Sequence, residues 1–341
     1  MAKVLEIENL HTSFFTRRGE VKAVRGVNFS LERGEILGVV GESGSGKSVT
    51  AMSVMQLLAS GGKITDGTVN FDGTDLVGLS EEKLREVRGA RISMVFQDPM
   101  SSLNPLITVG KQVQEMLDTH TKMSKAEAKE RVLELFRLVR IPEPERRYGS
   151  YPHEFSGGMR QRVVIAMALA CDPEVLIADE PTTALDVTIQ DQILRILRRL
   201  QADLGMSVVF ITHDLGVVAE LCSRVIVMYG GTIVEEGTLE EIFSETAHPY
   251  TLGLLASVPR IDGDRSQRLE SIPGSPPDLL DPPPGCPFAA RCEFARNICN
   301  EVAPAEVRLS PTHTSKCHLL APEAPAENNP FVEVRSAHVA G

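Results

Sequence analysis

The segment that most constrains the fold is an apolar run followed by a glycine-rich loop and a helical pattern. Residues 36–40 read Ile-Leu-Gly-Val-Val, and residues 41–48 read Gly-Glu-Ser-Gly-Ser-Gly-Lys-Ser. Apolar spacing over residues 49–60 predicts a helix directly after the loop. Strand, loop and helix in this order form the Walker A pattern, in which backbone N–H groups and the helix N-terminus face a phosphate.

Two side chains of this loop have predicted roles in nucleotide binding. Lys47 can bridge the β- and γ-phosphates of a nucleotide, and the Ser48 hydroxyl can join a Mg²⁺ shell. An ordinary Gly/Ser turn is the alternative, but it explains neither the lysine nor the flanking strand and helix. The candidate nucleotide-binding residues are Gly41, Ser43, Gly44, Ser45, Gly46, Lys47, Ser48 and Val49.

Two carboxylates follow another apolar run. Residues 175–178 read Val-Leu-Ile-Ala and precede Asp179 and Glu180. A strand that ends there places both side chains at the carboxyl edge of a parallel sheet, where ligands bind in open α/β proteins. Asp179 suits an outer-shell Mg²⁺ role, and Glu180 suits a general base for the attacking water. A solvated acidic strand end is the alternative reading.

Single polar residues end two more apolar runs. Gln97 follows Met-Val-Phe, and its amide can hold water or Mg²⁺. His213 follows Phe-Ile-Thr, and its imidazole can contact a γ-phosphate and report whether that phosphate is present. A purely structural histidine is the alternative at position 213.

Residues 155–162 read Phe-Ser-Gly-Gly-Met-Arg-Gln-Arg and lead into an apolar helical run over residues 163–170. Ser156, Gly157 and Gly158 therefore predict a second anion-binding helix start. If this start cannot reach its own phosphate loop, two chains placed head to tail would join each loop to the partner's Ser-Gly-Gly. A simple capped helix is the alternative.

Together these motifs resemble the ATPases of ABC transporters over roughly residues 4–255. Residues 156–161 resemble the signature of that family, with Met159 where Gln is usual; Gln97 resembles its Q-loop, residues 183–186 its D-loop and His213 its switch histidine. The resemblance implies an α/β fold, namely a RecA-like P-loop core with an inserted helical subdomain. It also implies MgATP sandwiched in a dimer.

The resemblance extends to individual roles. It implies that Ser156 and Gly158 act on the partner's nucleotide and that Asp186 couples the two sites. It further implies an upstream aromatic stacked on adenine, for which Phe15 is the best candidate and Phe14 the alternative. A core aromatic on the first hairpin is the other reading of Phe15.

Composition divides the chain near residue 256. Residues 256–341 hold 13 of the 21 prolines, which predicts little regular structure there. Alternating strand and helix patterns predict an α/β nucleotide-binding domain over residues 1–255, interrupted by a helical subdomain at about 98–170. Helices are expected over Lys111–His120 and Ser124–Val139. Strands are expected over Val27–Leu31, Glu35–Val40, Ile92–Phe96, Val175–Ala178, Ser207–Thr212 and Arg224–Met228.

Two further stretches, residues 97–105 and 247–259, resemble the oligopeptide/dipeptide importer branch of the family. The Pro-rich tail with its cysteines is similar to the C-terminal extension of that branch. The resemblance implies an ATPase subunit for di- and oligopeptides or related solutes such as nickel chelates. It implies a second homologous ATPase, two transmembrane permease subunits and an external substrate-binding protein, with this chain peripheral on the cytoplasmic face of the inner membrane.

Four of the six cysteines lie in the tail, at Cys286, Cys292, Cys299 and Cys317. Four thiolates in a segment too proline-rich for a large core usually mean metal, because coordination can supply folding energy. The close Cys pairs typical of zinc sites are absent. The wider spacing suits a [4Fe–4S] cluster, which the resemblance also implies. Zinc, with His313 or His318 as substitute ligands, and free thiols stay open.

The formal net charge of −11 disfavours a broad nucleic-acid or anionic-lipid surface. No stretch approaches the roughly 20 apolar residues of a membrane-spanning helix. The first residues lack a secretory signal pattern, so we expect a protein that is soluble and cytoplasmic, or one docked on a membrane through other proteins. A soluble ABC ATPase acting on nucleic acid or ribosomes is the rival class. A third reading makes the cysteine module a redox or iron sensor that gates the ATPase.

Overall fold

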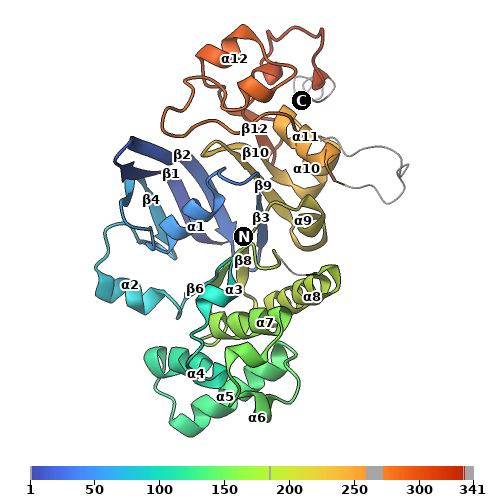
Figure 1. Ribbon diagram of the computed structural model, residues 1–341. Helices are drawn as coiled ribbons and strands as arrows, with labels where there is room; N and C mark the ends of the chain where they lie inside the picture. The colour runs from blue at the N-terminus through green and yellow to red at the C-terminus, as the bar shows by residue number, and fades with distance from the viewer. Residues whose placement is uncertain (1, 184–185, 259–271, 333, 335–341) are drawn as a thin grey trace. The chain divides into compact units, whose positions relative to one another are not determined.

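The computed structural model describes residues 2–183, 186–258, 272–332 and 334 (Figure 1). The chain divides into two compact units, each assembled from segments that are distant in sequence. The first unit comprises Met1–Leu5, Ser30–Ile36 and Asn70–Ile211, and the second comprises Glu6–Phe29, Leu37–Val69 and Thr212–Gly341.

Strands and helices alternate along most of the chain, which confirms the α/β class. The strands are β1 (Lys3–Thr16), β2 (Gly19–Glu32), β3 (Ile36–Val40), β4 (Gly62–Phe71), β5 (Thr74–Asp75), β6 (Ile92–Val95), β7 (Val175–Asp179), β8 (Ser207–Thr212), β9 (Arg224–Tyr229), β10 (Thr232–Thr238), β11 (Val307–Arg308) and β12 (Thr314–Ser315). The α-helices are α1 (Lys47–Val54), α2 (Glu81–Val87), α3 (Pro99–Ser102), α4 (Val109–His120), α5 (Lys125–Leu138), α6 (Pro144–Arg147), α7 (Gly157–Ala168), α8 (Val187–Leu204), α9 (Leu215–Leu221), α10 (Leu239–Ser244), α11 (Pro249–Ala256) and α12 (Asn297–Glu301). Short 3₁₀ turns are η1 (Pro152–Glu154), η2 (Ala289–Arg291) and η3 (His318–Leu320).

The first unit is built on parallel strands. β6 pairs with β7 and β7 with β8, so that Ile177 lies between Met94 and Val209. Every residue of these three strands is buried. Strands that are covered on both faces read as continuous apolar runs rather than alternating ones, which is why the sequence marks them clearly.

The helices α4, α5, α6 and α7 of the same unit pack against one another, as their grouping in green in Figure 1 shows. α5 begins at a capping box in which Ser124 accepts from the Glu127 N–H and the Glu127 carboxylate accepts from the Ser124 N–H. Val132 and Phe136 lie one turn apart and are fully buried. Both predicted helices are present, and α4 begins two residues earlier than expected, at Val109.

In the second unit β3 and β9 are parallel, and β10 pairs antiparallel with β9. β12, from the tail, adds antiparallel to β10, and β11 adds to β12. Part of the chain after residue 256 thus belongs to this sheet, as the red strand beside β10 in Figure 1 shows. β2, β1 and β4 are neighbours in a separate sheet.

Two helix boundaries differ from the sequence-based expectation. α1 ends at Val54 rather than near residue 60, because Gln56 takes a left-handed conformation with φ 51°. α7 begins at Gly157, well before the apolar run at 163–170, because the Ser156 side chain caps it. In the part of the chain that is described, no helix combines the length and apolarity needed to cross a bilayer.

Candidate functional site

The glycine-rich loop leaves the buried end of β3 and enters α1 at Lys47. Gly41 has φ 151°, and a Cβ there would lie 2.2 Å from the Met228 carbonyl oxygen. Gly46 has φ 104°, and a Cβ there would lie 2.7 Å from the Ala23 carbonyl oxygen. Only glycine fits either position, so the loop can keep its backbone N–H groups close to one point.

Lys47 is 5% exposed, and its ammonium group is folded onto the loop. Nζ donates to the Gly41 carbonyl at 2.7 Å, to the Glu42 carbonyl at 3.0 Å and to Ser45 Oγ at 3.5 Å. Ser48 is the second residue of α1. The loop therefore holds a cation beside a helix N-terminus, an arrangement that suits a phosphate.

The predicted carboxylates lie at the end of β7, in the first unit. Asp179 is the last residue of the strand and is 4% exposed. Glu180 follows with φ 46°, a conformation that non-glycine residues seldom adopt. Its N–H donates to the Ile211 carbonyl at 2.9 Å, which fixes the backbone of this turn against β8.

The structure brings Gln97 and Glu180 together. Gln97 Nε2 donates to Glu180 Oε2 at 2.9 Å, although β6 has already ended at Val95. Thr183 Oγ1 donates to the same oxygen at 2.9 Å. Sequence reasoning placed Thr183 only in the D-loop and missed this contact; a hydroxyl three residues after the carboxylate, in a turn, was the available signal. The two donors hold the Glu180 side chain in one orientation.

The predicted second helix start has the expected local form. Ser156 is the N-cap of α7, and its Oγ accepts from the Met159 N–H at 3.4 Å. Ser156 and Gly157 are exposed, whereas Gly158 is buried. A Cβ on Gly158 would lie 2.5 Å from Ile189 Cγ2 of α8, so packing within this unit also requires a glycine there.

Asp186 and His213 are two further candidates. Asp186 caps α8, with its Oδ1 accepting from the Ile189 N–H at 2.9 Å. Ala184 and Leu185 of the predicted D-loop lie outside the described residues. His213 is exposed and follows directly after the end of β8.

Phe15 lies near the end of β1, and its N–H donates to the Gly61 carbonyl at 2.9 Å. The side chain is 51% exposed, whereas Phe14 is half-buried. The core reading of Phe15 is therefore wrong, and part of the ring is available to a flat ligand.

The candidate residues divide between the two units. Phe15, the phosphate loop and His213 belong to the second unit, and Gln97, Ser156–Gly158, Asp179, Glu180 and Asp186 belong to the first. The roles of these residues toward nucleotide phosphate and water stay predictions.

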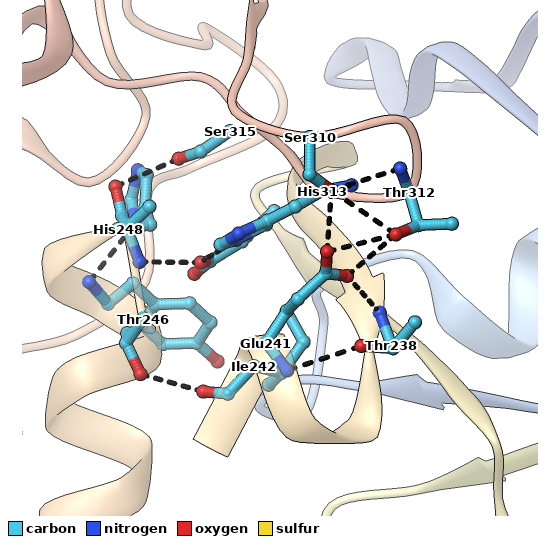
Figure 2. Close-up of polar contacts among 12 residues, drawn as sticks. Thr238, Glu241, Ile242, Thr246, His248, Ser310, Thr312, His313 and Ser315 are labelled. Carbon is cyan, nitrogen blue, oxygen red and sulfur yellow. Dashed lines mark hydrogen bonds and ion pairs between the residues drawn. The ribbon is translucent and has the colours of Figure 1, made fainter. Parts of the chain in front are cut away.

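The tail is anchored to β10 and α10 by buried polar contacts. His313 Nε2 lies 2.9 Å from Glu235 Oε1, and both side chains are almost fully buried. Burial raises the pKa of Glu235, and the neighbouring imidazole opposes that rise. Figure 2 shows Ser310 and Thr312 directed at the Glu241 carboxylate, to which both hydroxyls donate. His313, one of the substitute zinc ligands, is therefore engaged by Glu235.

All four tail cysteines line one small pocket, which is also lined by His248 and His318. None of them forms a disulfide. Burial raises the pKa of Cys286 and of Cys292 to about 11, and it raises that of Cys317 further. Among the described residues, no group of three or more His, Cys, Asp or Glu side chains is arranged to hold a metal ion.

Comparison with known families matches two regions of the chain. A profile described as "ABC transporter" matches residues 24–183. A second, described as "Oligopeptide/dipeptide transporter, C-terminal region", matches residues 234–299. The second match includes Cys286, Cys292 and Cys299 and ends before Cys317.

Similar proteins cover nearly the whole chain. The oligopeptide transport ATP-binding protein OppD of Bacillus subtilis is 55% identical over 331 residues, which are 97% of this chain and 92% of that protein. The dipeptide transport ATP-binding protein DppD of the same organism is 55% identical, over 94% of this chain and 95% of that protein.

Solved structures resemble about 70% of the chain. A dimeric post-hydrolysis structure of the ATP-binding cassette MJ0796 bound to ADP and Pi is 32% identical and has a TM-score of 0.63, covering 69% of this chain and 98% of that one. The structure of cbiO1 from Clostridium perfringens is 31% identical and has a TM-score of 0.61, covering 72% and 92%. The chain belongs to the ATP-hydrolysing subunits of the oligopeptide/dipeptide family of ABC transporters.

Proposed function

We propose that this chain drives the import of dipeptides or oligopeptides through a membrane complex. The observation that carries the proposal is that one chain matches both the ABC cassette and the C-terminal region of peptide transporters. The two relatives named above are peptide-transport ATP-binding proteins, and each aligns with this chain over almost its full length. Related solutes such as nickel chelates belong to the same proposal, because other subunits would select the cargo.

The proposed chemistry assigns roles to this chain's own residues. Lys47 and the loop N–H groups bind the β- and γ-phosphates of ATP, and Phe15 stacks on adenine. Glu180 accepts a proton from the water that attacks the γ-phosphorus, ADP leaves, and His213 contacts the γ-phosphate. Ser48, Gln97 and Asp179 would hold Mg²⁺, whose charge offsets that of the phosphates.

The proposed assembly contains two ATPase chains. Ser156, Gly157 and Gly158 of each would complete the γ-phosphate site of the other, and Asp186 would couple the two sites. The partner is a second homologous ATPase subunit. Closure of the pair would move two transmembrane permease subunits, to which an external binding protein delivers the cargo. The chain would then lie at the cytoplasmic face of the inner membrane without entering it.

Purification from a detergent extract of membranes tests this assembly. We expect the tagged chain to bring down two permease subunits and a second ATPase, and the reconstituted complex to hydrolyse ATP faster when a peptide-loaded binding protein is added. The same complex without peptide is the matched control. Recovery of ribosomes or nucleic acid without permease subunits would contradict the import proposal and support the soluble rival.

We also propose that Cys286, Cys292, Cys299 and Cys317 hold a [4Fe–4S] cluster, with zinc as the alternative. Four soft ligands around one pocket fit the donor set of such a cluster. The thiols would have to draw closer than they are and lose their protons. Since the pKa values of Cys286 and Cys292 are near 11, loading must release protons and weaken as the pH falls.

Anaerobic purification checks the cysteine module. The unmodified chain is expected to be brown and to contain about four iron atoms. Cys292→Ser should lose most of this iron, whereas Cys171→Ser, outside the tail, should keep it. A colourless protein with about one zinc per chain would favour the alternative. Absence of both metals would leave the four residues as free thiols.

A further inference from the structure

The second residue of the phosphate loop is held by an arginine from the tail. Glu42 follows Gly41. Its carboxylate accepts hydrogen bonds from both terminal nitrogens of Arg291. Arg291 NH1 lies 2.5 Å from Glu42 Oε2, and NH2 lies 3.0 Å from Oε1. A planar guanidinium that meets a carboxylate in this two-pronged way fixes its orientation as well as its charge.

Arg291 is itself firmly placed. Its side chain is 5% exposed, and NH1 also donates to Tyr229 Oη at 3.0 Å. Nε donates to the Pro273 carbonyl at 2.8 Å, and NH2 donates to the Ile272 carbonyl at 2.9 Å. The contact with Glu42 raises the pKa of Arg291, so the guanidinium stays charged at any ordinary pH.

The same region contacts the loop backbone. The Glu42 N–H donates to Tyr250 Oη at 2.7 Å. The Phe288 ring packs against Tyr229 and Tyr250, with centroids 5.2 and 5.3 Å away, and it also lines the cysteine pocket. Arg291 directly precedes Cys292 in the chain. The loop is therefore braced by a segment of the cysteine module.

This brace has two consequences for a phosphate ligand. The Gly41 and Glu42 carbonyls accept from Lys47 Nζ, so the position of Glu42 sets the position of the lysine. The Glu42 carboxylate also carries negative charge on the loop that receives phosphate. With Arg291 paired to it, that charge is balanced; without Arg291, it would repel the nucleotide.

We propose that Arg291 is a positioning residue for ATP binding, which holds the phosphate loop in shape and balances the charge of Glu42. This role makes the tail a part of the nucleotide-binding machinery rather than an appendage to it. The inference rests on the proposed contact between Lys47 and phosphate.

Equilibrium binding of the magnesium complex of AMP-PNP, a non-hydrolysable ATP analogue, tests the role in the full chain. Arg291→Gln is expected to raise the Kd about tenfold, and the KM for ATP similarly, while kcat changes less than about twofold. Arg291→Lys keeps the charge but cannot contact both oxygens of Glu42 in the same way, so its Kd should lie between those of the unmodified chain and Arg291→Gln. The double variant Glu42→Gln/Arg291→Gln should recover most of this loss and bind within about threefold of the unmodified chain, because the unbalanced carboxylate is gone and only the support of the loop by Arg291 is still missing.

Rescue by the double variant separates this role from a structural one, because damage to the tail would not be repaired by a change at Glu42. Arg296→Gln is the matched control, since Arg296 donates to the Pro325 and Glu327 carbonyls of the tail. Unchanged binding in Arg291→Gln, or equal loss in the single and double variants, would overturn the proposal. If Arg291→Gln and Lys47→Ala both left binding unchanged, the proposed contact between Lys47 and phosphate would itself be wrong. If Lys47→Ala weakened binding and Arg291→Gln did not, only the proposed role of Arg291 would be wrong.

Discussion

Glu180→Gln is expected to lower the kcat of ATP hydrolysis about 10²- to 10³-fold while MgATP binding stays close to normal. Gln97 and Thr183 both donate to one Glu180 oxygen at 2.9 Å, so the carboxylate is held in one orientation. Glutamine keeps the size and one acceptor oxygen but cannot take a proton from water. Binding and proton transfer should therefore separate in this variant.

The measurement is single-turnover hydrolysis together with the mass of the ATP-bound species. A trapped, ATP-loaded pair of subunits is expected, because the step that releases it is blocked. Glu130→Gln is the matched control, since Glu130 is an exposed carboxylate that pairs with Arg137 on α5. Normal turnover by Glu180→Gln, with all partner subunits present, would remove Glu180 from the role of base.

Lys47→Ala is expected to weaken MgATP binding about 100-fold and to abolish measurable hydrolysis. The substitution removes the cation that would face the phosphates. It also leaves the Gly41 and Glu42 carbonyls without the donor they share, so the loop loses an internal contact as well. Both effects act in the same direction on nucleotide affinity.

Titration calorimetry with MgATP measures this loss, and circular dichroism checks that the chain is folded. Lys125→Ala, at the exposed start of α5, is the matched control and should bind normally. Binding of comparable strength by Lys47→Ala would contradict the assignment of residues 41–48 as the phosphate loop.

Much of this organisation could be read from the sequence, because its signals are local. Buried strands such as β7 read as short apolar runs, and the glycines at 41 and 46 stand where the backbone permits no side chain. The cysteine spacing predicts one cluster; the four cysteines line one pocket, but no metal-holding group is found among the described residues, so the cluster stays a prediction. The conformation of each segment follows from neighbours along the chain, and a single sequence contains that information.

Contacts between distant segments could not be predicted in this way. Arg291 and Glu42 are 249 positions apart, and no local pattern indicates that they meet. Gly158 reads as a phosphate ligand, yet its contact with Ile189 also makes it a packing residue. The Thr183 hydroxyl reaches Glu180 only because the backbone turns at a left-handed residue.

The tail strand β12 has a consequence for solubility. Residues 314 and 315 pair with Glu236 and Glu235 along the open side of β10. An uncovered sheet edge is a template for the strands of other molecules. A shortened chain that ends after α11 would expose that edge, together with a buried carboxylate deprived of His313. We therefore expect such a shortened chain to self-associate more readily than the full chain.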